Sequence, residues 1–369
     1  WSSVDFKDAM EFVRNDDNLI LNGNNNLSFF PSKRFSLKVN KQNALAAGTI
    51  TESQKAQCDS SIIFEFNSER DRYLARDEIM MMDIVANNDW KRGIYFSSNR
   101  GSSFSFALLS AGYIKQVGIA YELSPVKITQ EEQKNGMYCD LDKMYNNLTK
   151  KYKFGDMNNP NVLTDYYARR HTKDYRNAFL LLAEQYINIK NTDRAKELLD
   201  RSLKIMPLET VLDFGEVNQC DPFTSIKTNM MNFSYDYKGQ ELPSKCSGNL
   251  HEYVQLYYLA GDKKKAEVLG LKLMNNYKSI FAYFENSDTE FMKNSENNRD
   301  LIAALDACFK MRYTAEQEDK EGKFYKDISS SIKKVYATIL PRIQGSTSDE
   351  LKYLEAYLVA MKSHYDLSK

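Results

Sequence analysis

This sequence predicts an α+β unit with a small mixed sheet, followed by an all-α domain of helical hairpins. Strand-like segments rich in β-branched and aromatic residues are confined to roughly the first 150 residues. Helical periodicity dominates from there to residue 369. A chain of this length also exceeds the ~250–300 residues at which a single core usually stops growing. We therefore predict an α+β domain at 1–150 and an α-helical domain at 151–369.

The first domain begins with alternating helix and strand signals. Apolar spacing over Val4–Arg14 predicts a short amphipathic helix. An Asn- and Gly-rich turn at Asn22–Asn26 separates two apolar segments and predicts a pair of strands. Alternation of Phe35, Leu37 and Val39 with polar residues predicts a strand with one buried face, and Ser60–Phe66 predicts another.

Residues 60–125 continue this pattern. Leu74–Asn88 predicts a helix that ends at two asparagines. Gly93–Phe96 predicts a strand, and the apolar segment Phe104–Leu109 predicts a short helix. Val117–Leu123 predicts one more strand. The order of strands and helices indicates a mixed sheet covered by one or two helices.

The clearest helical segment, Arg176–Pro207, fits a tetratricopeptide-like hairpin. Such repeats are ~34-residue helical pairs in which small residues allow close packing and a proline ends the second helix. With Pro207 at that terminal position, the key packing positions are filled by Phe179, Leu182, Ala183, Tyr186, Ala195, Leu199 and Ser202. A second hairpin is expected over Leu250–Met274 around the turn Gly261-Asp262.

Between the two hairpins, residues 208–247 depart from repeat spacing and predict an irregular insertion. Further helices are expected at Asn298–Arg312, at Lys323–Leu340 with a stop at Pro341, and at Ser348–His364.

Composition narrows the function classes. Lys+Arg and Asp+Glu both number 50, so the formal net charge is zero and no global field gathers nucleic acid. No segment reaches the ~18 uninterrupted apolar residues of a membrane-spanning helix. The sequence starts at Trp1 without a signal peptide, which we interpret as a fragment or a processed chain. The five cysteines form no CxxC pair and the three histidines are scattered, so we expect no zinc site, no other cofactor and no recognisable catalytic centre.

Asp140 and Asp142 have the DxD spacing with which two carboxylates can hold a divalent metal against a sugar-nucleotide diphosphate. The simpler interpretation is that Asp142 caps the helix that begins at Lys143.

Four residues around one predicted strand are candidate binding residues. An exposed Trp90 beside Arg92 and Tyr95 would form a platform for a sugar or a partner protein, and the alternative is that Trp90 packs into the core. Arg100 lies in the polar turn after the strand, which could wrap an anion but is more simply a connecting loop.

Four sequence stretches resemble a known family. Arg76–Phe96, Phe29–Leu37, Gly118–Pro125 and Met144–Leu148 resemble the soluble C-terminal region of a bacterial family of multi-pass membrane proteins of unknown function, the DUF2723 type. That family is related to GT-C fold glycosyltransferases of the protein O-mannosyltransferase type. The resemblance covers most of residues 1–210, and none of these stretches is a catalytic motif.

The resemblance implies a non-catalytic, periplasmic C-terminal module, attached to the inner membrane through an N-terminal multi-pass region of the same polypeptide. Its partners would be that membrane region and a protein or glycan acceptor. In such an oxidising compartment Cys220 and Cys246 would be candidates for a disulfide, although both can equally be free. Two alternatives stay open, a surface glycan-binding protein and a free-standing metal-dependent sugar-nucleotide enzyme.

Overall fold

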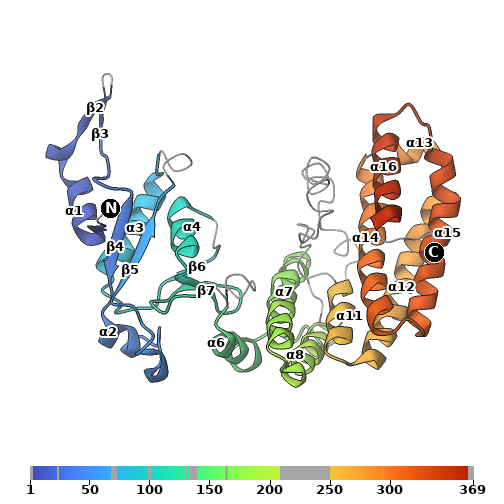
Figure 1. The fold of residues 1–369 in the computed structure, drawn as a ribbon, viewed down its shortest axis with the longest axis horizontal. Helices are drawn as coiled ribbons and strands as arrows, with labels where there is room; N and C mark the ends of the chain where they lie inside the picture. The colour runs from blue at the N-terminus through green and yellow to red at the C-terminus, as the bar shows by residue number, and fades with distance from the viewer. Residues whose placement is uncertain are drawn as a thin grey trace. The chain divides into compact units, whose positions relative to one another are not determined.

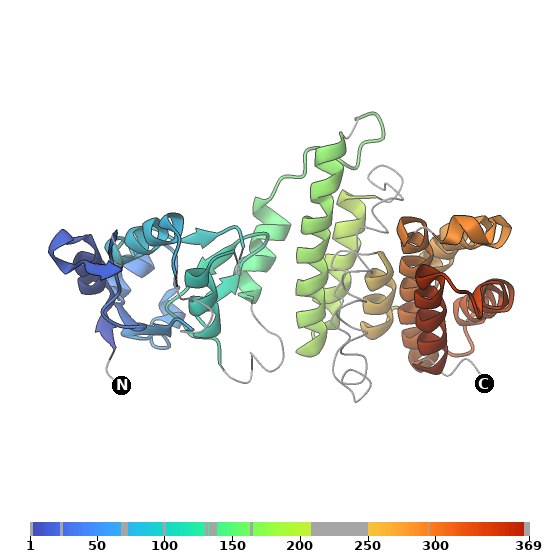
Figure 2. The same cartoon turned by 90° about the horizontal axis from the view of Figure 1, so that it is seen from above.

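The computed structural model describes residues 3–22, 25–67, 73–98, 101–129, 132, 139–162, 165–207, 250–293 and 295–364. The chain forms two compact units, Trp1–Tyr152 and Lys153–Lys369 (Figures 1 and 2). Unit 1 combines strands and helices, and the described part of unit 2 is helical. The predicted fold class, α+β followed by all-α, is therefore confirmed.

The mixed sheet of unit 1 is built from β1 (Val4–Asp5), β4 (Arg34–Lys38) and β5 (Ser61–Glu65). β1 runs parallel to β4, and β4 runs antiparallel to β5. The side chains of β4 and β5 alternate between the core and the outer face of the sheet. This explains why apolar and polar residues alternate in the sequence of these strands.

Aromatic rings fill the core of unit 1. Phe6 in α1 (Phe6–Arg14) lies with its ring centroid 5.1 Å from that of Phe64 and 5.7 Å from those of Phe35 and Phe104. The helices α3 (Arg76–Asn87) and α4 (Ser103–Ser110) add further apolar side chains to the same core.

The remaining elements of unit 1 are short. They are η1 (Asp16–Asn18), β2 (Ile20–Asn22), β3 (Asn25–Leu27), α2 (Lys41–Ala46), η2 (Glu52–Gln54), β6 (Tyr95–Phe96), β7 (Ile114–Gln116), β8 (Tyr121–Leu123), α6 (Leu141–Asn146) and the π-helix η3 (Asn147–Lys151). β2 and β3 form a hairpin as expected, but its second strand is Asn25–Leu27, which overlaps the predicted turn Asn22–Asn26. β6, β8 and β7 form a second antiparallel sheet in that order.

The single strand predicted over Val117–Leu123 is wrong. β7 ends at Gln116, Gly118 turns the chain with a φ of +143°, and only Tyr121–Leu123 pairs as β8. A side chain at residue 118 would also meet the hydroxyl of Tyr152. The close turn therefore requires glycine, and the apolar segment becomes a hairpin instead of one strand.

Unit 2 is a stack of antiparallel helical pairs. Its helices are α7 (Tyr166–Asn188), α8 (Thr192–Ile205), α11 (Leu250–Leu259), α12 (Lys263–Asn286), α13 (Thr289–Met292), α14 (Ser295–Glu318), α15 (Lys323–Ile343) and α16 (Asp349–His364). The first helices of successive pairs contact one another in the order α7, α11, α14 and α16, and the second helix α12 packs against α15. Figure 2 shows α7, α8 and α11 side by side in green to yellow.

The residues expected at hairpin packing positions are buried. Phe179, Leu182, Ala183, Ala195 and Leu199 are all 0% exposed. The predicted insertion at 208–247 lies outside the described residues.

The expected helix stop at Pro341 is wrong, because α15 continues through it to Ile343. Arg342 explains the extra turn. Its guanidinium donates to the carbonyls of Phe284 and Glu285 at 3.2 and 3.0 Å, at the C-terminal end of α12. Tertiary contacts of this residue, together with the buried Ile343, outweigh the one backbone hydrogen bond that a proline removes.

Candidate functional site

The four predicted binding residues do not form one exposed platform. Trp90 is 5% exposed and its indole Nε1 donates to the backbone carbonyl of Lys38 at 2.9 Å, so it belongs to the core of unit 1. Arg92 is exposed, and Tyr95 is 57% exposed. Arg100 lies outside the described residues. Only Arg92 and Tyr95 are thus accessible in the described part, and their binding role stays a prediction.

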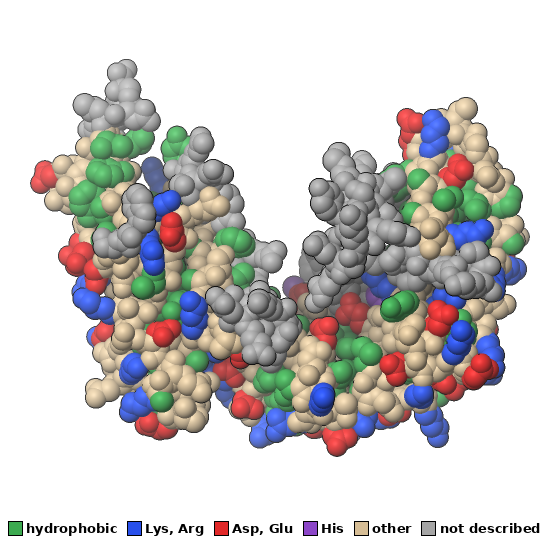
Figure 3. All heavy atoms as spheres, viewed as in Figure 1, with side chains coloured by type: hydrophobic (Ala, Val, Ile, Leu, Met, Phe, Trp, Pro, Cys, Tyr) green, Lys and Arg blue, Asp and Glu red, His purple; other side chains and the backbone are tan. Residues whose placement is uncertain are grey.

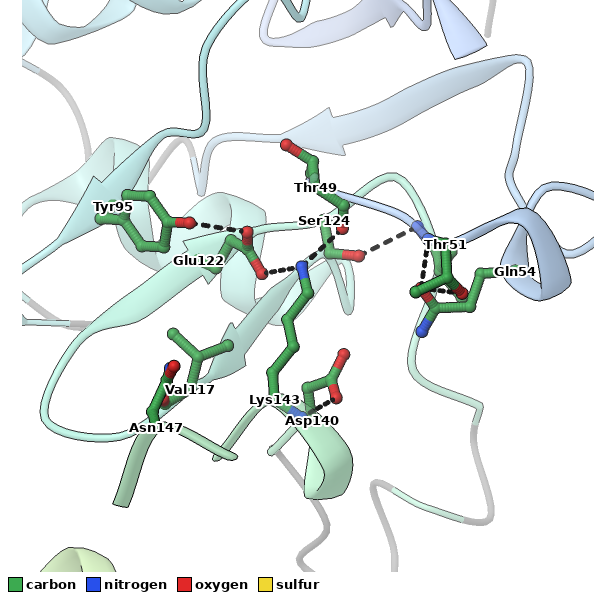
Figure 4. Close-up of polar contacts among 11 residues, drawn as sticks. Thr49, Thr51, Gln54, Tyr95, Val117, Glu122, Ser124, Asp140, Lys143 and Asn147 are labelled. Carbon is green, nitrogen blue, oxygen red and sulfur yellow. Dashed lines mark hydrogen bonds and ion pairs between the residues drawn. The ribbon is translucent and has the colours of Figure 1, made fainter. Parts of the chain in front are cut away.

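Tyr95 leads to a buried charge cluster that sequence reasoning missed. Its hydroxyl donates to Glu122 Oε1 at 3.1 Å, and Lys143 Nζ donates to Glu122 Oε2 and to the carbonyl of Thr49, both at 2.7 Å (Figure 4). The Glu122 side chain is 2% exposed. Lys115 lies directly across from Glu122 in the β7–β8 pair. These contacts join the β6–β8–β7 sheet to α6 and to the segment after α2.

Burial dominates the electrostatics of this cluster. Desolvation raises the pKa of Glu122, and the positive charge of Lys143 opposes that effect. Desolvation together with the nearby Glu122 carboxylate raises the pKa of Tyr95 to about 12. Burial lowers the pKa of Lys115, which the negative charge of Asp140 counteracts. At neutral pH the tyrosine is therefore a neutral hydrogen-bond donor to a buried carboxylate.

The geometry of the cluster suits a structural role. Glu122 is enclosed and both of its oxygens accept hydrogen bonds. Further contacts hold the segment after β7: Asn147 Nδ2 donates to the carbonyl of Val117 at 2.6 Å, and the Asp140 amide donates to the carbonyl of Gln116 at 3.0 Å. A carboxylate so placed can anchor α6 on the sheet but cannot meet a substrate from solvent.

The DxD pair is divided between two positions. Asp140, and not Asp142 as expected, is the N-cap of α6, because Asp140 Oδ1 accepts from the Lys143 amide at 3.0 Å. Asp142 lies in the exposed first turn of the same helix. Within the described ranges, no group of three or more His, Cys, Asp and Glu residues converges as a metal site would require.

The histidines and cysteines are also dispersed. His171 is exposed, whereas His251 is 3% exposed and its burial lowers its pKa to about 3, so that it stays neutral. Cys58, Cys139 and Cys308 are free thiols. The candidate disulfide partners Cys220 and Cys246 lie outside the described residues.

Unit 2 contains a pocket of about 640 Å³ between α8 and α12. Its apolar walls and its lysines were not predicted as a site, although the sequence shows three consecutive lysines at residues 263–265. The lining side chains come from α8, α11, α12 and the adjoining turns, and are Leu203, Pro207, Tyr257, Asp262, Lys264, Lys265, Val268, Leu269 and Lys272.

The polar contacts at the base of this pocket are internal. Asp200 accepts a hydrogen bond from the Tyr257 hydroxyl at 2.8 Å and forms an ion pair with Lys265 at 2.7 Å. Lys265 also lies 3.4 Å from Asp262. These contacts fix the side chains around an apolar hollow, an arrangement that favours binding over catalysis.

Comparison with known proteins gives one family match. The family model described as TMEM260-associated domain 2 matches residues 2–143, which lie within unit 1 and include both Glu122 and Lys143 of the buried ion pair. No curated protein and no solved structure matches the chain. None of the helices in the described part is both long and apolar enough to cross a membrane.

Proposed function

We propose that this chain is the extracytoplasmic C-terminal module of a membrane-embedded glycosyltransferase, and that it binds an acceptor or partner protein without being catalytic itself. The match of residues 2–143 to TMEM260-associated domain 2 is the observation that carries the proposal. Three of the four stretches that resemble the DUF2723-type, GT-C-related membrane proteins lie inside the matched residues. In this proposal the module is periplasmic and follows a multi-pass region of the same polypeptide.

The helical unit supports the binding part of the proposal. The first helix of each pair packs against the first helix of the next pair, and the second helices α12 and α15 also pack against each other. Tetratricopeptide-like repeats are expected to stack in this way. Stacked repeats of this kind present extended surfaces to other proteins. Figure 3 shows acidic and basic side chains interspersed on the face in view, which fits selective contacts better than attraction by a single-sign field.

The alternative of a sugar-nucleotide enzyme has lost the observation that suggested it, since Asp140 is engaged as a helix cap. The glycan-binding alternative has likewise lost Trp90 as its stacking platform, because that ring is buried. Neither alternative gains an observation from the described residues.

Expression of the complete reading frame in a bacterial host, with a C-terminal epitope tag, tests the placement. We expect the tagged chain in the membrane fraction, and we expect proteinase K added to spheroplasts to remove the tag while a cytoplasmic marker survives. Co-purification of residues 1–369 with the membrane region, expressed as a separate polypeptide, tests the partnership. A tag that is protected from the protease, or a reading frame without membrane-spanning helices, would contradict the proposal.

A further inference from the structure

The chain passes from one unit to the other between two anchored aromatic residues. Unit 1 ends at Tyr152 and unit 2 begins at Lys153. The Tyr152 side chain is held by unit 1, and the side chain of Phe154, two residues later, is held by unit 2. Lys153 is the one residue between these two anchors. The contacts on each side therefore decide where the chain is free to turn.

The anchor in unit 1 is the turn between β7 and β8. The Ile119 amide donates to the Tyr152 hydroxyl at 3.4 Å. The same hydroxyl lies so close to Gly118 that a Cβ at that position would clash with it. The preceding helix α6 is attached to the same sheet by the buried ion pair between Glu122 and Lys143. The chain is thus fixed in unit 1 up to Tyr152.

The anchor in unit 2 is an aromatic contact with α7. The ring centroid of Phe154 lies 5.3 Å from that of Tyr175 and 6.0 Å from that of Phe179. Phe179 is 0% exposed and belongs to the core of the first helical pair. Directly after Phe154 the chain turns through Gly155 and Asp156, which have φ values of +61° and +54°. The chain is thus fixed in unit 2 at Phe154.

Lys153 itself is exposed. In the described part of the chain, neither its backbone groups nor its ammonium group takes part in a hydrogen bond or an ion pair. Domain motions use one or a few such residues to absorb changes in φ and ψ. α12 and α14 have 24 residues each and are about 36 Å long, so a rotation of roughly 20° at one residue displaces distant parts of unit 2 by about 10 Å.

We propose that Lys153 is a hinge about which unit 2 turns as a rigid body, with Tyr152 and Phe154 as the fixed points on either side. A change in the torsions of this one residue leaves both cores intact. The hinge lets the helical unit follow a bound partner without loss of either anchor. This inference goes beyond the proposed function and does not depend on the membrane placement.

Double electron–electron resonance on the full 369-residue chain measures the motion. p-Acetylphenylalanine replaces Gln57 in unit 1 and Lys204 in unit 2, which are both exposed, and each carries a ketoxime-linked nitroxide so that the native cysteines stay unlabelled. The pairs Glu11/Gln57 and Lys204/Lys333 give the distribution widths within each unit. We expect the distance distribution between the units to be at least about two-fold wider than either distribution within a unit.

Substitutions at the junction locate the motion. Lys153→Pro fixes one backbone torsion, and the ψ of 140° at Tyr152 suits a following proline, so this variant should narrow the distribution between the units. Lys153→Gly should widen it by freeing the backbone, and Phe154→Ala should widen it by releasing the anchor in unit 2. Lys320→Gly, in the turn between α14 and α15, should leave the width unchanged. Circular dichroism melts establish that each variant is folded.

Three results would overturn the inference. A distribution between the units as narrow as those within them would show that the units move as one body. A broad distribution that Lys153→Pro leaves unchanged would place the motion elsewhere in the chain, and so would the absence of widening in Lys153→Gly. None of these results bears on the cellular location of the chain, so failure of the hinge is distinguishable from failure of the proposed placement.

Discussion

Replacing Lys143 with methionine should destabilise unit 1 by about 3 kcal/mol, because the change leaves the Glu122 carboxylate buried with Tyr95 as its remaining side-chain donor. Removing one partner of a buried ion pair typically costs about 3–5 kcal/mol. The lower end applies here because the Lys143 side chain is 24% exposed and water can reach part of the vacated space.

A double-variant cycle separates the charge effect from the loss of packing. Glu122→Gln combined with Lys143→Met removes both charges, so it should recover at least about 1 kcal/mol relative to the single lysine variant. As a control, Lys38→Met breaks the ion pair between Lys38, whose side chain is 85% exposed, and Asp5. This variant should lose far less stability than Lys143→Met, because solvent screens the exposed pair.

Tryptophan emission during urea unfolding measures unit 1 alone, since both tryptophans, Trp1 and Trp90, lie in that unit. The transition of unit 1 can therefore be fitted separately from the helical signal of unit 2 in circular dichroism. Equal costs for the buried and the exposed lysine variants would refute the anchoring role of the cluster. A double variant as unstable as the single one would show that an unpaired charge is not the cause.

The stability lost in Lys143→Met should also depend on pH, because the unpaired Glu122 carboxyl is buried. Without Lys143, the folded-state pKa of Glu122 stays above its unfolded value, because desolvation already raises it in the intact protein. A folded state that holds the proton more tightly gains stability as pH falls through that raised pKa toward the unfolded pKa. The stability deficit of Lys143→Met relative to the parent should thus shrink between neutral and mildly acidic pH.

Three further predictions concern packing and the independence of the units. Gly270→Ala should lower the stability of unit 2 by about 1–2 kcal/mol despite the better helix propensity of alanine, because the new methyl carbon would lie 2.6 Å from the Phe324 ring. In a Phe324→Leu background the same change should be neutral or stabilising in urea titrations. A stabilising effect of Gly270→Ala in the parent protein would contradict the close packing. Trp90→Phe should lower the melting temperature of unit 1 through the lost hydrogen bond to Lys38 and lost volume, and unchanged stability would contradict its core position. A 153–369 fragment should retain its helical circular dichroism spectrum, since helical pairs bury their apolar faces mainly against neighbouring pairs, and a random-coil spectrum would show that the units share one core.

Periodicity predicted the elements of both units because it depends on local spacing. Phe35 and Leu37 lie in a strand that buries every second side chain, and Phe179 and Ala183 lie on the packed face of a helix, as expected. Errors occurred where tertiary contacts or single glycines decide the structure. Gly118 converts an apolar segment into a turn, and Arg342 holds a helical turn beyond Pro341.

The buried cluster could not be predicted for a related reason. Glu122 and Lys143 are 21 residues apart, and their pairing depends on how α6 returns to the sheet. The only local signal was Glu122 itself, a charged residue between Tyr121 and Leu123 in a predicted strand. A buried strand normally contains a charged side chain only where a partner compensates the charge. For Trp90 the local pattern left two interpretations open, and the hydrogen bond to Lys38 shows that the ring is structural.

The pocket and the irregular part of the sequence have a common origin in repeat spacing. Had a regular repeat followed α8, the next pair would bring its second helix onto α8 as α15 lies on α12. Residues 208–247 intervene at that step, and it is there that Val268 is left exposed and the lysines of α12 gather around an apolar hollow. The break in repeat spacing and the pocket between α8 and α12 therefore fall at the same step of the described stack.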